Sequence, residues 1–533
     1  MDLPERRRAT ARFTPTVGAS TIPEPDDGCG AGIAGLEPGV LYGMVSGVDR
    51  SPRRITQDEL AGFGDPMARF HFRQGSFPMT VQELLAGLPG SPTRKTQGVY
   101  LISEAGQIPP ATAPHLKRDI RFAITRAVAG CTADLLISTG ANADPRTTFL
   151  QVAAWDPVAL VFNFYMRIAP GWVWAGNSWA ALDPASRGRA CFDSHVNGSV
   201  VMKELKLPWM NWQSQSATIQ LAPDDPLRRN PLFAEVQGAE NLELTIRGLI
   251  HQWTTARLAR ITAGGVIAHP DRLLRQLLTT TTVNLVSSPI QSSAVTAQNE
   301  PLPLPRGFWL NGDVLLDGLD LPVSFSLPAV SASLYLESLR TFDFHLVERA
   351  SGFSQPGDTF FAFAVPEAAY EDNDVVVQAV RAGLIPPKFA AALMMVDFQN
   401  PVFSVARARL MAYVPTVPCP ASALAGTIAD AITAAARQLP AASPEAQFAA
   451  NWSLPDGEWQ NTFGKRIDDY MGRVSSRIGE RTGFNDYVRL AESRRQQFRA
   501  LRLNEFELTT PVTNIPPEPR WRMHEDATVG AQP

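Results

Sequence analysis

The polar run Cys191-Phe-Asp-Ser-His-Val-Asn-Gly198 carries the side chains that acid–base chemistry and metal binding use. His195 could act as a general base or a metal ligand, since a neutral imidazole offers a free nitrogen near neutral pH. Asp193 could orient that imidazole or join it as a ligand, as carboxylates beside histidines commonly do. A histidine that only holds a loop by hydrogen bonding would have the same local sequence, so both interpretations stay open.

Aromatic residues crowd around this run. Residues 146–213 contain six of the eleven tryptophans. Trp172 and Trp209 are among those that could line a pocket and exclude water from it, which strengthens polar interactions inside. We expect the pocket to centre on 188–213, read as a loop that leads into a helix beginning near Ser199. An ordinary hydrophobic core would show the same density.

The remaining histidines show no local metal signature, because neither HxxxH nor HExxH occurs. A site of two histidines and one carboxylate could still assemble from distant segments, with His195 joined by His251 or His345 as metal ligands. Iron is the metal that such a site would favour. Cys191 lies four residues before His195 and could be a nucleophile, although a nucleophile and its base normally meet through the fold.

The hairpin 156–177 resembles a stretch of the heme catalases. It opens with Asp-Pro, its first strand carries Phe-Tyr, and a Trp stands four residues before Gly-Asn on the second strand. The resemblance implies a heme with Asn177 above it and His71 as the distal histidine. Tyr335 is the tyrosine that could ligate the iron, but Ser331 stands where the family has an arginine. The resemblance covers about 22 residues.

The composition is typical of a globular protein with a large hydrophobic core. The 533 residues are 45% hydrophobic and 19% charged, and the net charge is -4. This charge gives no reason to expect nucleic acid or an anionic membrane as a partner. Four scattered cysteines without CxxC argue against a disulfide framework. With no signal-like or membrane-spanning apolar stretch, a cytoplasmic location is expected.

Short runs of β-branched and aromatic residues, joined by turn-rich links, predict an antiparallel meander or partial barrel. Phe164 and Met166 alternate with Tyr165 and Arg167, which predicts one apolar and one mixed face. A helix is predicted over 111–129. The predicted strands are 97–104, 133–139, 147–155, 159–168 and 171–176.

Helical spacing dominates after residue 238. Long helices are predicted over 238–262 and 465–503, the second interrupted near Gly483 and basic on its solvent side. Strands followed by helices, without βαβ alternation, favour the α+β class. The predicted divisions are an irregular arm (1–37), a β-rich domain (38–230), a mainly helical region with short strands around 300–330 (231–510) and a tail (511–533).

Two further motifs are not interpreted as functional sites. Gly30-Ala-Gly-Ile-Ala-Gly35 matches the letters GxGxxG but follows no strand and opens no helix, so nucleotide binding is not predicted. The acidic run Glu371-Asp-Asn-Asp374 stands at the start of a helical stretch, where carboxylates cap the helix and suit its dipole.

These observations lead to three hypotheses. The first is an iron- or heme-dependent oxidoreductase acting on a small apolar or aromatic substrate, with His195 as ligand or base, Asp193 orienting it and Asn177 in the pocket. The second is a metal-free enzyme that uses His195 as general base. The third is a non-enzymatic interaction or assembly protein, in which the arm and the basic 465–503 helix bind partners. A homo-oligomer is compatible with each.

Overall fold

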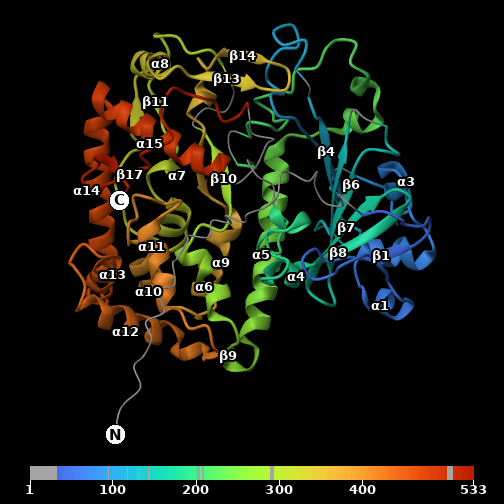
Figure 1. Cartoon of the computed structure of the whole chain (residues 1–533), viewed down its shortest axis with the longest axis horizontal. Coiled ribbons are helices and arrows are strands. Elements are labelled where there is room, and N and C mark those ends of the chain that lie inside the picture. Colours follow the sequence, from blue (N-terminus) through green and yellow to red (C-terminus); the bar gives the residue numbers. More distant parts are fainter. Residues whose placement is uncertain are drawn as a thin grey trace.

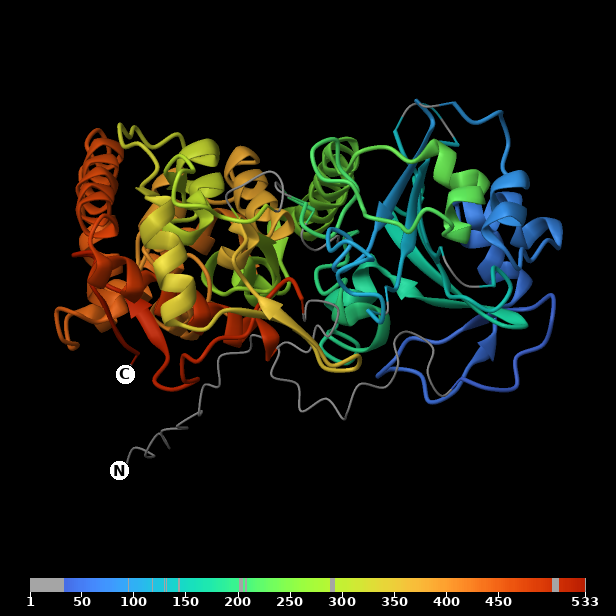
Figure 2. The same ribbon diagram turned by 90° about the horizontal axis from the view of Figure 1, so that it is seen from above.

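The computed structural model describes residues 33–532 except 94, 117, 129, 131, 142–143, 201–204, 207–208, 288–292 and 501–507. The described chain has a sheet part and a mainly helical part that lie side by side (Figures 1 and 2). The long helix α5 (Ala239–Thr262) runs between them. The α+β class predicted from the order of strands and helices is confirmed.

The sheet part is built on eight strands in the order β2-β1-β8-β7-β6-β5-β4-β3. Neighbours are antiparallel except β1 and β8, which run parallel. The five predicted strands are confirmed and correspond to β3 and β5 to β8. The bounds are β1 (Leu41–Gly43), β2 (Arg53–Arg54), β3 (Gln97–Ile102), β4 (Arg121–Arg126), β5 (Leu135–Gly140), β6 (Leu150–Asp156), β7 (Val161–Ile168) and β8 (Gly171–Asn177).

The helix predicted over 111–129 is wrong, because residues 121–126 form strand β4 between β3 and β5. Along β4 the side chains alternate between the two faces: Phe122 and Ile124 enter one hydrophobic cluster, and Ala123 enters the other. The apolar residues of 111–129 are also spaced at helical intervals by chance, and this spacing hid the alternation that is typical of a strand. Pairing with two neighbouring strands then decides the conformation, since strand preference depends strongly on context.

Both faces of the sheet are covered. On β7, Phe164 and Met166 pack in the cluster on the side of α5, whereas Tyr165 enters the cluster on the opposite side. Short helices of the first hundred residues contribute to that opposite cluster, so the mixed face predicted for β7 is buried too. These helices are α1 (Gln57–Gly62), α2 (Pro66–Phe70) and α3 (Val81–Ala86); α4 (Ser178–Leu182) follows β8.

The helical part surrounds the largest hydrophobic cluster, which draws side chains from residues 258–527. Its helices are α6 (Pro270–Leu278), α7 (Arg306–Trp309), α8 (Ala332–Thr341), α9 (Tyr370–Arg381), α10 (Pro387–Met394), α11 (Val405–Arg409), α12 (Leu424–Ala436), α13 (Pro444–Trp452), α14 (Trp459–Ile478) and α15 (Arg481–Arg499). Its two-stranded pairs are β9 (Val266–Ile267) with β16 (Cys419–Pro420), β10 (Val283–Val286) with β15 (Val365–Ala368), β11 (Leu302–Pro303) with β12 (Ala329–Val330), β13 (His345–Glu348) with β14 (Phe353–Pro356), and β17 (Trp521–Met523) with β18 (Val529–Ala531).

The last residues are part of this core. The β17–β18 hairpin buries Met523, and Asn400 holds the Met523 backbone by donating to its carbonyl and accepting from its amide. The segment predicted as a tail is therefore packed over 521–531. The predicted interruption of the 465–503 helix falls at Gly479–Glu480, between α14 and α15. Within the described residues, no helix combines the length and apolarity needed to cross a bilayer.

Candidate functional site

The His195 loop is held by the protein itself. Nδ1 of His195 donates to the Ser199 carbonyl at 2.9 Å, and the imidazole lies against the Phe164 ring with centroids 4.8 Å apart. Asp193 ends a 3-10 helix (Ala190–Asp193) and is exposed. No helix begins at Ser199, and residues 205 and 206 are not helical; residues 201–204 and 207 of that predicted helix lie outside the described residues.

Asn197 fixes the same loop to the helical part. Its side-chain amide donates to Thr281 Oγ1 at 2.8 Å and to Asp372 Oδ1 at 3.2 Å. Its carbonyl accepts from the Trp253 indole at 2.8 Å. The loop thereby joins the sheet part to α5 and α9, which gives its polar residues a structural task.

The other predicted pocket groups have structural partners as well. Asn177 is the N-cap of α4, where its side-chain oxygen accepts from the amides of Trp179 and Ala180. Trp172 is fully buried on the sheet face away from α5 and donates to the Pro78 carbonyl. Trp209 donates to Glu243 on α5 at 2.8 Å.

The residues implied by the catalase resemblance do not converge. His71 lies beside α2 in the sheet part, whereas Tyr335 is on α8 in the core of the helical part (Figure 1). The Tyr335 hydroxyl donates to backbone carbonyls of Thr359 and Phe360 and accepts from the Phe363 amide. That role is structural.

The three predicted metal ligands have separate partners. His251 on α5 pairs with Asp374 at 3.3 Å, and His345 on β13 lies next to Asp343, whereas His195 packs on the sheet. Among the residues that the structure describes, no group of three or more histidine, cysteine or acidic side chains could hold a metal ion.

Cys191 forms a disulfide bond, and its partner lies outside the described residues. The scattered cysteines argued against a disulfide framework and gave no sign of this single bond. A sulfur held in a disulfide is not available as a thiolate nucleophile, which removes the Cys191 alternative.

A buried carboxylate that no sequence pattern singled out lies beneath the sheet. Asp65 is the N-cap of α2 and accepts from Tyr165 Oη at 2.7 Å and Asn163 Nδ2 at 2.9 Å. Asn163 in turn accepts from the Trp174 indole at 2.9 Å. Burial raises the pKa of Asp65 to about 6, against these hydrogen bonds. Each group of the network is satisfied within the protein.

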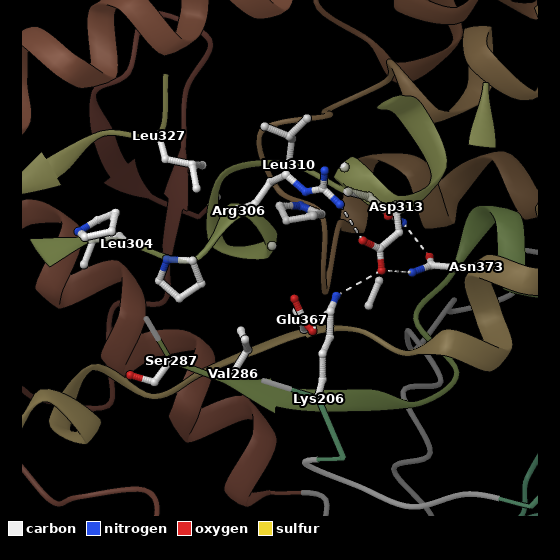
Figure 3. A pocket seen from close by; sticks show the side chains of 17 residues that line it. Lys206, Val286, Ser287, Leu304, Arg306, Leu310, Asp313, Leu327, Glu367 and Asn373 are labelled. Carbon is white, nitrogen blue, oxygen red and sulfur yellow. Dashed lines mark hydrogen bonds and ion pairs between the residues drawn. The ribbon is translucent and has the colours of Figure 1, made fainter. Parts of the chain in front are cut away.

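A pocket with apolar walls and charged groups at one end lies in the helical part (Figure 3). Its volume is about 220 Å³. Its lining comes largely from residues 303–313, which include α7 and the start of the π-helix that follows it (Asp313–Gly318), with contributions from β10 and β15. Of the described residues in the predicted 188–213 centre, Lys206 alone lines it. Single π-turns occur frequently at functional sites.

The charged end is organised around Lys206. Its Nζ lies 2.9 Å from Glu367 Oε1 and 3.0 Å from Asp313 Oδ2. Asp313 also accepts from Arg306 at 2.9 Å and from Asn373 at 3.2 Å, and Arg306 pairs in addition with Asp317. Figure 3 shows Lys206, Arg306 and Asn373 directed at the Asp313 carboxylate.

Two glycines permit this arrangement. A Cβ at Gly307 would lie 2.2 Å from Glu367 Oε2, and one at Gly312 would lie 2.4 Å from Arg306 Nε. Contacts that close do not occur between real side chains. The backbone of residues 305–313 therefore lies against two charged side chains, those of Glu367 and Arg306.

The protonation states follow from burial and neighbours. Burial raises the pKa of Glu367, and the Lys206 ammonium opposes that shift only in part. Although burial would lower the pKa of Lys206, the carboxylates of Glu367 and Asp313 raise it, so this amine stays charged. Lys206 is therefore a fixed cation and a poor nucleophile, whereas the raised pKa makes the Glu367 carboxylate a better proton acceptor than an ordinary glutamate.

Glu367 and Lys206 were not among the site residues predicted from the sequence. One signal for Glu367 existed: it is the only charged residue in the apolar run Phe360–Ala369. A charge inside such a run must be buried and paired. Of the acidic run 371–374, Asp372 lies in the first turn of α9 as predicted, and Asn373 contributes to the pocket. Lys206 had no local signal, because its partners lie more than a hundred residues away.

The basic face predicted over 465–503 is extensively paired. Its cations meet carboxylates of the same helices and of distant segments. These pairs are Lys465–Asp469, Arg466–Glu525, Arg477–Asp486, Arg481–Glu337, Arg489–Asp486, Arg495–Glu492 and Arg499–Glu492. A surface neutralised in this way offers little net attraction to a polyanion.

Comparison with known proteins adds no relative: no family model matches the chain, and no match is found among curated proteins or solved structures. The catalase-like hairpin therefore remains a local resemblance. The geometry of the pocket carries the functional argument.

Proposed function

We propose that the protein is an enzyme that binds a small molecule with an apolar body in the pocket at Lys206, Glu367 and Asp313, and that Glu367 exchanges a proton with it. The observation that carries the proposal is a buried carboxyl with a raised pKa at the wall of a cavity. Perturbed groups of this kind in clefts are frequently catalytic.

The charges of the four ionisable residues suggest a different role for each. Lys206 and Arg306 fix the charge at this end of the pocket, and Asp313 holds both cations in place. Glu367 keeps its carboxyl against Gly307, within reach of a ligand. Leu304 and Leu310 belong to the apolar wall and would exclude water from the proton transfer.

A thermal-shift screen of small molecules with apolar bodies tests this proposal. We expect hits whose stabilisation disappears in Ala368→Phe, which places a ring at the pocket wall. The control is Ala421→Phe, a partly buried alanine outside the pocket that should keep the hits. Any turnover found with a hit should be lost in Glu367→Gln. Hits that stabilise both phenylalanine variants equally would contradict the proposal.

The iron- or heme-dependent oxidoreductase predicted from His195 stays a separate hypothesis. An iron site made of histidines requires that these side chains lie together around the metal. His195, His251 and His345 each have other partners. Metal analysis and an absorption spectrum of protein produced with iron would test it directly. The predicted homo-oligomer and cytoplasmic location likewise stay predictions.

A further inference from the structure

Glu367 has acceptor capacity that the protein leaves unused. A carboxylate can accept about four hydrogen bonds. Within the described chain, the one cation at ion-pair distance from Glu367 is Lys206, and Oε1 makes no hydrogen bond of good geometry. Asp313, by contrast, receives donors from Lys206, Arg306 and Asn373. The under-used acceptor is therefore Glu367, and it lines the pocket.

The charges at this end do not balance. The carboxylates of Asp313, Asp317 and Glu367 face the two cations Lys206 and Arg306. One negative charge remains when all are ionised, and the least paired carboxylate is the deeply buried Glu367. An uncompensated buried charge is costly, so a cationic ligand would be favoured here and an anion repelled.

The rest of the lining sets the size and the form of such a ligand. Apolar side chains, among them Val286, Leu304 and Leu310, form much of the remaining wall, and Figure 3 shows Leu304 and Leu327 on the side away from Asp313. The volume of about 220 Å³ suits one short chain or ring. None of the described lining residues is aromatic, so the pocket offers no aromatic cage to a quaternary amine.

We propose that the pocket takes a small primary ammonium with an apolar tail, its N–H groups donating to Glu367. This inference rests on the proposed function and names its substrate class. It fits the unused acceptor, the uncompensated charge and the apolar wall together. Lys206 and Arg306 tolerate the added cation because each is already held by two carboxylates.

Calorimetric titration with pentylamine, pentanol and pentanoate tests the inference on the full chain. We expect pentylammonium to bind roughly tenfold or more tightly than pentanol, and pentanoate to bind least. Glu367→Gln keeps the shape of the side chain and should abolish that preference. Glu337→Gln is the matched control, because Glu337 pairs with Arg481 outside the pocket and its charge cluster, and it should retain the preference.

The outcomes separate this inference from the proposed function. If pentanol or pentanoate binds as tightly as pentylamine and Ala368→Phe abolishes that binding, the pocket is real and the ammonium inference is wrong. If Glu367→Gln keeps the preference for pentylamine, the inference is also wrong. If none of the three probes binds the wild-type chain, both the inference and the proposed function fail.

Discussion

The carboxylates of Asp65 and Glu367 are both buried, but they have different surroundings. Asp65, beneath the sheet, accepts from a tyrosine, an asparagine and a backbone amide, and its network is closed. Glu367, in the helical part, has a single cation and lies at the wall of a pocket. Burial and a raised pKa are common to both, so neither identifies a site. Unused hydrogen-bonding capacity that faces a cavity distinguishes Glu367.

Asp65→Ala should have the largest effect on stability. It leaves the Tyr165 hydroxyl and the Asn163 amide without their buried acceptor and removes the N-cap of α2. We expect a loss of about 3 kcal/mol in the free energy of unfolding, measured by urea denaturation. A loss below about 1 kcal/mol would show that the network is not closed as described.

Asp372→Asn should change the pH dependence of stability. Burial raises the pKa of Asp372 to about 6 from its ordinary 3.8, so the folded state holds this proton more tightly than the unfolded state. Its stabilising contribution is complete below pH 3.8 and is lost as the pH rises through about 6. Relative to the variant, the wild type should lose up to about 3 kcal/mol between those limits. A constant difference across that range would contradict this expectation.

His195→Ala tests the region from which the first functional hypothesis came. The substitution removes a ring contact with Phe164 and a hydrogen bond to the Ser199 carbonyl. We expect a loss of about 1 kcal/mol in the free energy of unfolding and unchanged binding of pentylamine. If binding fell together with a change in bound metal, the site would belong to His195 and not to Glu367.

Glu367→Ala should have the smallest effect on stability, in contrast to Asp65→Ala. Lys206 keeps Asp313 as its partner, and the pocket already admits solvent or ligand beside the lost side chain. We expect a change of less than about 1 kcal/mol by the same urea denaturation. A loss of unfolding free energy as large as that of Asp65→Ala would show that Glu367 has a structural role like that of Asp65.

Local pattern predicted much of the fold. The alternation along 159–168 and the helical spacing over 238–262 both gave the element that the structure has. The strand at 121–126 was missed because a short apolar run fits either period, and only its pairing with β3 and β5 decides. The packed hairpin at 521–531 was missed because its burial depends on Asn400, far away in the sequence.

The candidate site was much harder to predict. His195 drew attention because its neighbours in sequence are polar, yet one of them, Asn197, joins the loop to the helical part of the protein. The pocket gathers Lys206, Arg306 and Glu367 from segments separated by some sixty to a hundred residues, and no local spacing records that meeting. Only the lone charge in the apolar run before α9 could have pointed to it.

A crystal structure of the full chain soaked with pentylammonium tests most directly whether Glu367 offers a vacant acceptor to a ligand. We expect a ligand nitrogen within hydrogen-bonding distance of the Glu367 carboxylate, with the alkyl chain along Val286, Leu304 and Leu310. An ordered ligand elsewhere with this pocket collapsed, or a Glu367 carboxylate fully bonded to protein groups, would contradict it.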